Sequence, residues 1–280
     1  MNKLLTLFFL IISSCETGNL NIITDLPKTL NEVSGTETTQ NTNLIWMLND
    51  SGNKARIYGI NKKGNIKKEL KINAKNHDWE DLSSDNVGNI YIGDFGNNLN
   101  KRTNLTILKV NVADLDKDSK IDIERISFKY PNQNKFPPKK KKMFFDCESF
   151  FYFNNNLYLF TKSRVRGNFG KTDLYKIPAT QGHHVAEYIN SFTSCEDHGC
   201  WITSADISED GKHVVLLSPN AAIVFSNFTS DDFFTGQVKR YDFSLYSQKE
   251  GVCFADNNTL LITDEKAHGT GGNLYSLKLN

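Results

Sequence analysis

A repeated unit constrains the fold of this chain more than any other feature of its sequence. In each copy an acidic residue opens a short strand, a turn rich in Asn, Asp and Gly follows, and a strand of β-branched and aromatic residues comes next. The clearest copy occupies residues 78–98, and the unit recurs every 44 to 68 residues. The acidic residues that mark the five copies are Glu32, Glu80, Glu148, Asp206 and Glu250. A spacing of this length is typical of the blades of a β-propeller.

Each unit continues with further strand sequence that completes a blade. A third strand is expected in all five units, and a fourth in the first four, at residues 66–72, 123–130, 185–189 and 237–243. The fifth unit ends after its third strand, but residues 20–25 form a spare apolar strand. Pairing of these two segments would close the ring without an open edge. We therefore predict an all-β fold, a five-bladed propeller of four-stranded antiparallel blades, with a six-bladed ring as the alternative.

The composition excludes some classes of function. The 280 residues carry a formal net charge of +1, which gives no electrostatic basis for binding nucleic acid. No apolar run after the first fifteen residues is long enough to span a membrane. We expect a monomer that does not bind nucleic acid.

The first residues read as a targeting segment. A short basic start is followed by an apolar run and by Ile12-Ser13-Ser14-Cys15, which resembles the lipobox of bacterial lipoproteins. The resemblance implies a signal peptide at residues 1–14, a lipidated tether at 15–19 that begins with Cys15, and a propeller domain at 20–280. It places the protein in the bacterial cell envelope, anchored by lipid to a bilayer, with the outer membrane the expected one. An ordinary secretory signal is the alternative.

Export makes a disulfide plausible between two cysteines close in sequence. Cys195 and Cys200 enclose four residues in a connection between units. An oxidising compartment favours a small disulfide loop there. Free thiols and a metal site remain as alternatives, although the spacing matches no strong zinc pattern.

Acidic residues should gather at one mouth of the propeller channel. The first strand of each blade lines the channel, and its start lies at the same face as the end of the second strand. Carboxylates that converge in a narrow space repel one another unless protons or a cation relieve the repulsion. Ca²⁺ would do so, with Glu32, Glu80, Glu148 and Glu250 as ligands. The full candidate site comprises Glu32, Glu80, Glu148, Asp206, Glu250, Asp50, Asp94, Lys162, Asp264 and His77.

Two other roles for these side chains stay open. The carboxylates could accept hydrogen bonds from backbone N–H groups of neighbouring blades and so hold the ring together. Lys162 could supply the compensating charge within the protein and make a metal unnecessary.

Several segments resemble a known group of proteins. The motifs at residues 32–35, 78–81, 89–98 and 248–252 resemble an uncharacterised family of exported bacterial propeller lipoproteins, over about residues 20–279. They are more distantly similar to the SdiA-regulated and esterase-like phytase propeller families. Gluconolactonase and paraoxonase propellers share the idea of a calcium ion at the channel mouth, but they have six blades, so their lactonase activity is not expected here.

Two functions of different classes follow from these observations. The first is a membrane-anchored ligand-binding or interaction module, whose ligand would be a small molecule, a glycan or a protein, with a divalent cation at the acidic mouth. The alternative is a metal-dependent hydrolase of an ester, a lactone or a phosphoester. The sequence contains no nucleophile with a base at recognisable spacing, which favours the binding function over catalysis.

Overall fold

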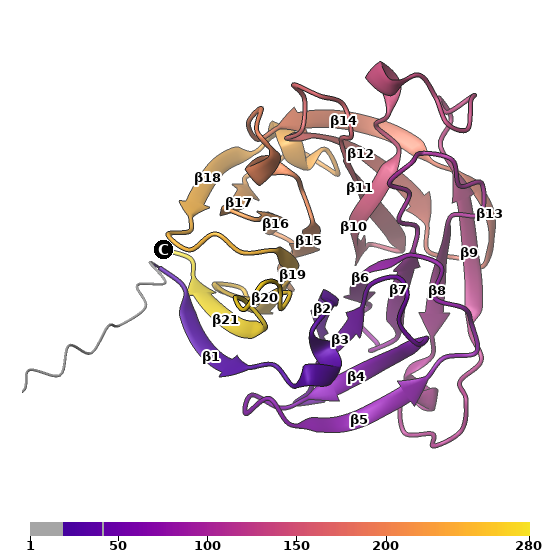
Figure 1. The fold of residues 1–280 in the computed structure, drawn as a ribbon. Coiled ribbons are helices and arrows are strands. Elements are labelled where there is room, and N and C mark those ends of the chain that lie inside the picture. Colours follow the sequence, from indigo (N-terminus) through magenta and orange to yellow (C-terminus); the bar gives the residue numbers. More distant parts are fainter. Residues whose placement is uncertain (1–18, 41) are drawn as a thin grey trace, which may run out of the picture.

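The strands form five sheets arranged in a ring around a central channel (Figure 1). The structure is a computed structural model and describes residues 19–40 and 42–280. Each sheet is a blade, its innermost strand lies along the channel, and successive strands step outward. This is the predicted five-bladed propeller, and the six-bladed alternative is wrong.

Four of the blades are built mainly from consecutive strands. The first contains β2 (Val33–Thr38), β3 (Ile45–Asn49), β4 (Arg56–Ile60) and β5 (Ile66–Lys71). The second contains β6 (Trp79–Ser84), β7 (Ile90–Asp94), β8 (Thr106–Val110) and β9 (Glu124–Lys129). The third contains β10 (Asp146–Phe153), β11 (Asn156–Lys162), β12 (Lys171–Pro178) and β14 (Glu187–Thr193). The fourth contains β15 (Ser204–Ile207), β16 (His213–Ser218), β17 (Ala221–Ser226) and β18 (Gln237–Asp242).

The fifth blade joins the two ends of the described chain. It consists of β19 (Lys249–Asp256), β20 (Thr259–Asp264), β21 (Asn273–Lys278) and, as its outer strand, β1 (Asn21–Asp25). β1 pairs antiparallel with β21 in the manner predicted (Figure 1). Leu20, which precedes β1, is buried in the core beside Tyr275 and Leu277.

One strand departs from the predicted arrangement. The segment expected as the fourth strand of the third unit, residues 185–189, divides between two blades. β13 (Gly182–Val185) pairs in parallel with β9 and becomes a fifth strand of the second blade, whereas β14 completes the third. The chain between β12 and β14 therefore reaches across to its neighbour (Figure 1).

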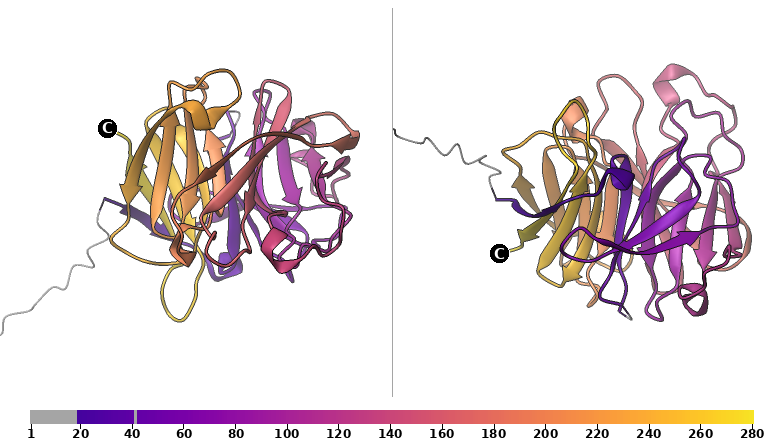
Figure 2. Two further views of the ribbon diagram at one scale, coloured as in Figure 1. Left: turned by 90° about the horizontal axis from the view of Figure 1, so that it is seen from above. Right: turned by 60° about the horizontal axis from the view of Figure 1, so that its bottom comes forward.

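Apolar side chains fill the spaces between neighbouring blades, because alternate residues of a strand face opposite sides of its sheet. Trp46 and Trp79 belong to the core between the first and second blades, and Phe151 and Phe225 to that between the third and fourth. The strands run between two faces from which the connecting loops project (Figure 2). Short 3-10 helices lie in these connections, at Lys28–Leu30, Val112–Asp114, Lys140–Lys142, His198–Cys200 and Phe233–Thr235.

Within the described ranges, no helix has both the length and the apolar character needed to cross a bilayer. The predicted signal segment and the lipidation residue Cys15 lie outside the described residues.

Candidate functional site

The innermost strands of four blades carry a β-bulge near their first residues. In β10 the register skips Glu148, and in β19 it skips Glu250, so each glutamate is the extra residue of its bulge. β2 and β6 have the same irregularity, between Val33 and Thr36 and between Trp79 and Leu82. A bulge bends the strand and redirects the side chain of the extra residue. β15, in the fourth blade, pairs with its neighbour in regular register.

Three carboxylates converge at the mouth where these strands begin. Asp50 follows β3, Asp78 precedes β6, and Glu80 lies at the bulge of β6. One oxygen from each lies within 4.8 Å of the others. Asp78 and Glu80 are two residues apart, which places them on one face of an extended chain. We call Asp50, Asp78 and Glu80 the acidic trio.

The three carboxyl groups of the acidic trio all have raised pKa values. Burial, reinforced by the carboxylates of Glu148 and Asp50, raises the pKa of Glu80 well above its ordinary value. Burial also raises the pKa of Asp50 to about 6 and raises the pKa of Asp78. Among the described side chains, no lysine, arginine or histidine forms an ion pair with any of the three, although ion pairs form nearby.

Glu80 is the least satisfied member of the trio. Its residue is only 6% exposed, and within the described part of the chain its carboxylate accepts no hydrogen bond. The backbone of Gly96 packs directly against it: a Cβ added at Gly96 would lie 1.9 Å from Glu80 Oε1 and 2.6 Å from Asp78 Oδ2. The glycine thus leaves space around the carboxylates that any other residue would fill.

The adjoining part of the mouth has its charges paired. Lys162 Nζ lies 2.9 Å from Glu148 Oε2, and Arg164 Nη2 lies 2.9 Å from Glu148 Oε1. Arg164 Nε donates to Asp146 Oδ2 at 2.5 Å. Burial alone would raise the pKa of Glu148, but the two cations lower it below its ordinary value. Lys162 is therefore the compensating charge of Glu148 rather than of the trio.

A second paired group lies on the other side of the trio. Asp94 ends β7, and its Oδ2 lies 2.9 Å from Nδ1 of His77, while its Oδ1 accepts from Arg102 Nη2 at 2.9 Å. The side chain of Asp94 is 3% exposed and that of His77 is 41% exposed. The buried carboxylate therefore holds an imidazole that is partly exposed at the mouth.

Two further predicted residues lie at the mouth without joining the trio. Burial raises the pKa of Glu250 to about 8, although the nearby Lys162 ammonium lowers it. Glu32 is exposed, and its Oε2 accepts from Asn53 Nδ2 at 2.6 Å. The predicted four-glutamate set is thus dispersed, because Glu148 is ion-paired and Glu32 lies at the rim.

Asp264 was expected beside the ring of carboxylates, but its oxygens are already used. Its Oδ2 accepts from Ser247 Oγ at 2.6 Å and from the Tyr275 hydroxyl at 2.8 Å, and its Oδ1 accepts from the backbone N–H of Asn273 at 2.9 Å. The residue is fully buried. These contacts hold the fifth blade together around a carboxylate that is not exposed at the mouth.

The placement of Asp206 at this mouth is wrong. Ser204 Oγ accepts the backbone N–H of Val252 in the next blade, just as Asp81 accepts the backbone N–H of Phe150, so Ser204 and Asp81 occupy equivalent positions. The residue equivalent to Glu80 is then Thr203, which carries no carboxylate. Asp206 lies further along β15, at the opposite end of the channel.

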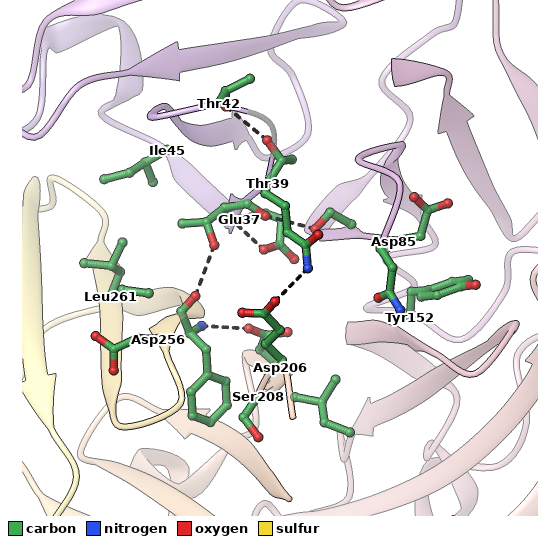
Figure 3. Close-up of a pocket in the computed structure, with 18 of the residues that line it drawn as sticks. Glu37, Thr39, Thr42, Ile45, Asp85, Tyr152, Asp206, Ser208, Asp256 and Leu261 are labelled. Carbon is green, nitrogen blue, oxygen red and sulfur yellow. Dashed lines mark hydrogen bonds between the residues drawn. The ribbon is translucent and has the colours of Figure 1, made fainter. Parts of the chain in front are cut away.

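The opposite end of the channel opens into a cavity of about 920 Å³ (Figure 3). Asp206 and Glu37 contribute to its lining, together with residues of the loops that join first to second strands. We call it the opposite cavity. Glu37 stands at the fifth position of β2, away from the acidic start of its unit, which is why the repeat pattern did not single it out.

Cys195 and Cys200 form a disulfide, with their Cα atoms 5.7 Å apart. The loop leads into Trp201, whose ring centroid lies 5.4 Å from Lys162 Nζ and 5.3 Å from Arg164 Cζ. The disulfide therefore borders the ion-paired part of the mouth.

Several residues of the site are not predicted by the repeat pattern of the sequence. Asp78 and Asp146 each stand two residues before a predicted glutamate, and this alternation is a signal that could have identified both. Arg164 and Arg102 lie beyond the strand ends, and only the fold brings them to the mouth.

Comparison with known proteins gives the fold and no closer relationship. No family model matches the chain, and no curated protein matches it. Among solved structures it is similar to a gluconolactonase from Xanthomonas campestris, at 11% identity and a TM-score of 0.52, over 93% of this chain and 89% of that one. It is also similar to a putative gluconolactonase, at 9% identity and a TM-score of 0.52, over 94% of this chain and 92% of that one. The chain is a β-propeller. A virginiamycin B lyase from Staphylococcus aureus superposes less well, at 16% identity and a TM-score of 0.43, over 91% and 69% of the two chains.

Proposed function

We propose that the acidic trio binds Ca²⁺ and that the propeller uses this mouth to bind an oxygen-rich small molecule. The observation that carries the proposal is Glu80, a buried carboxylate that has neither a hydrogen bond nor a cation among the described residues. A buried charge without a partner is costly unless an ion compensates it. Asp50, Asp78 and Glu80 would hold the ion through oxygen atoms, which are the ligands that Ca²⁺ prefers.

The three carboxylates would fill only part of the coordination sphere of a calcium ion. Ca²⁺ takes about six to eight oxygen ligands, which is more than three carboxylates provide. Water and the oxygen atoms of a ligand would supply the rest. Lys162 and Arg164 border the same mouth, where both are ion-paired with Glu148. Their N–H groups could also donate hydrogen bonds to the oxygen atoms of a ligand.

The test is calcium binding by the purified protein after treatment with a chelator. A ligand that binds only the folded state stabilises that state by about 2.7 kcal/mol when its concentration is a hundred times its dissociation constant. We expect Ca²⁺ to raise the melting temperature and to give a titratable heat of binding. Glu80→Gln and Asp78→Asn should abolish both effects, whereas Glu37→Gln, at the opposite cavity, should retain them.

A different outcome would refute the calcium site. If Ca²⁺ leaves the wild type unchanged while Glu80→Gln melts higher, the trio is strained by its own charge and binds no calcium. Gly96→Ala gives a second check, because its Cβ would occupy the space next to Glu80 and should weaken calcium binding more than stability.

A second candidate function is hydrolysis of an ester or a lactone at the same mouth. The pairing of His77 with Asp94 favours it, since a carboxylate that fixes Nδ1 leaves Nε2 to accept a proton. Two propellers of similar fold are described as gluconolactonases. When bound, the ion would supply Lewis-acid polarisation of the substrate carbonyl. His77 would take a proton from water as its oxygen adds to the carbonyl carbon, and would return it to the leaving alkoxide as the acyl C–O bond breaks.

Turnover of δ-gluconolactone and of p-nitrophenyl acetate with added Ca²⁺ tests this second candidate. We expect His77→Asn to lose activity by about two orders of magnitude, typical for removal of a general base. His183→Asn, on β13, is the matched control and should keep it. Calcium binding without any hydrolysis of such substrates would leave the ligand-binding function and reject catalysis.

We also propose that Cys15 carries a lipid that anchors the propeller to a membrane of the bacterial envelope. The support is the lipobox-like segment of the sequence. Cys15→Ala should move the protein from the membrane fraction to the soluble fraction or leave it unprocessed. A variant that fractionates with unchanged mass would show that the cysteine is not lipidated.

A further inference from the structure

The opposite cavity has the dimensions of a ligand site. Its volume of about 920 Å³ lies within the range found for pockets that bind small organic molecules. Its walls come from loops of all five blades, among them residues 38–40, 42–45, 84–86 and 206–210. Tyr152 and Asp85 lie on one side of the view in Figure 3, and Ile45 and Leu261 on the other.

Two carboxylates lie together near the middle of this cavity (Figure 3). Glu37 comes from β2 and Asp206 from β15, the two strands that flank β19. Phe254 on β19 contacts Asp206 and the residue that follows Glu37: its N–H donates to Asp206 Oδ2 at 2.7 Å, and its carbonyl accepts from Thr38 Oγ1 at 3.1 Å. Glu37 is 5% exposed and Asp206 is 8% exposed. The pair is therefore preorganised by backbone contacts.

The negative charge of the pair is uncompensated. Over the described ranges, no lysine, arginine or histidine forms an ion pair with either carboxylate. A third carboxylate, that of Asp81, lies deeper in the channel, is completely buried and interacts electrostatically with both. Among the described residues of the lining, Lys62 is the one basic residue, against six acidic residues, Glu37, Asp85, Asp206, Glu209, Asp210 and Asp256. The cavity therefore favours a cation.

The walls favour an organic cation over a metal ion. Glu37 already accepts the N–H of Thr38 at 2.6 Å, and Asp206 accepts that of Phe254, so part of each carboxylate is used. The volume is far larger than one ion requires. Tyr152, Phe153 and Phe254 line the cavity, and aromatic rings attract cations that carry apolar groups.

We propose that the opposite cavity binds an organic ammonium ion, with its nitrogen between Glu37 and Asp206 and its apolar part against the aromatic side chains. This site is independent of the calcium site, because the two sets of carboxylates lie at opposite ends of the channel. Burial raises the pKa of Asp206 to about 7, and burial with the Asp206 charge raises the pKa of Glu37. Binding of a cation should therefore release protons near neutral pH.

The probe is 2-phenylethylammonium, and 2-phenylethanol is its neutral counterpart of similar shape. Both are titrated into the wild-type protein by calorimetry in EDTA, so that the calcium site does not contribute. We expect the ammonium to bind at least about tenfold more tightly than the alcohol, as charge-assisted hydrogen bonds are stronger than neutral ones. Its affinity should rise between about pH 6 and pH 8, with a heat that depends on the buffer's ionisation enthalpy.

Two variants remove charge while keeping an oxygen for the backbone N–H groups. Glu37→Gln and Asp206→Asn should each weaken ammonium binding about tenfold or more. Asp78→Asn, at the acidic trio, should change it little. If either charge variant fails to melt cooperatively, Tyr152→Leu is used in its place. Loss of this aromatic side chain from the cavity wall should also weaken the binding of the ammonium.

Four results would overturn the proposal. The folded wild type could fail to bind the ammonium, or it could bind the alcohol equally well. The folded variants could bind the ammonium with the affinity of the wild type. Ca²⁺ could displace the ammonium, which would identify a metal site instead. None of these results bears on the calcium site at the other mouth.

Discussion

The hydroxyl of Ser204 donates to Asp81, 3.2 Å from one carboxylate oxygen and 3.1 Å from the other. The two residues lie 123 positions apart and belong to the fourth and second blades. Asp81 also accepts the backbone N–H groups of Leu82, at 2.9 Å, and of Phe150, at 3.4 Å. This completely buried carboxylate therefore connects three innermost strands across the channel.

Asp81→Ala should lower the free energy of unfolding by about 2–4 kcal/mol. The change leaves buried N–H and O–H donors without an acceptor, each at a cost of about 1–3 kcal/mol. Asp81→Asn should cost less, because its amide oxygen still accepts from the backbone. Denaturant unfolding measures both values, and equal values for the two variants would contradict this role.

Lys162→Met should destabilise the protein by about 3–5 kcal/mol at neutral pH. Removing one partner of a buried ion pair is strongly destabilising, and Glu148 would keep Arg164 as its single cation. Calcium should restore part of the lost stability, because in this variant Glu148 adds to the negative charge beside the acidic trio. Lys68→Met, which removes an exposed ion pair with Asp116, is the control and should cost less than about 1 kcal/mol. Equal losses in the two variants would show that the Lys162 pair contributes no more than a surface contact.

Asp206 should make stability fall as the pH rises. Its folded-state pKa, about 7, lies above the ordinary value of roughly 4, so the folded state holds more protons between these values. The contribution is complete below about pH 4 and is lost as the pH rises through about 7. In EDTA, Asp206→Asn should reduce the fall in melting temperature across this pH range. Asp256→Asn, at the rim of the same cavity, should leave the slope as in wild type.

Removal of β1 should open the ring. Deletion of residues 19–26 exposes the hydrogen-bonding edge of β21 and removes Leu20, which is 1% exposed, from the core. We expect a drop in melting temperature of ten degrees or more, on the order of several kcal/mol. Ile22→Thr, at a side chain that is 50% exposed, should change little. A deletion variant that melts like wild type would refute the closure of the ring by this strand.

The strands could be predicted from sequence because their signal is local. The turn after Asp85 and the alternation in residues 89–92 indicate strands without knowledge of any partner. The bulges could not be predicted, since a bulge is a property of two paired strands. The repeat pattern likewise does not show that Thr203, three residues before Asp206, occupies the position equivalent to Glu80.

The carboxylates were predictable as a group, but their division into roles was not. The repeat placed Glu80 and Glu148 at one mouth, and both lie there. Whether a carboxylate is neutralised depends on side chains from connections after the strands, as with Arg164 beside Asp146. Such contacts depend on the three-dimensional path of those connections, which carry no periodic pattern.

The parallel pairing of β13 with β9 affects how the chain folds during its synthesis. Synthesis proceeds from the N-terminus, so β9 leaves the ribosome more than 50 residues before β13. During that interval the second blade has an unpaired outer edge, and β1 waits even longer for β21. Exposed strand edges can pair with other chains. The nascent chain therefore depends on protection from intermolecular association until the segments that cover its edges have been translated.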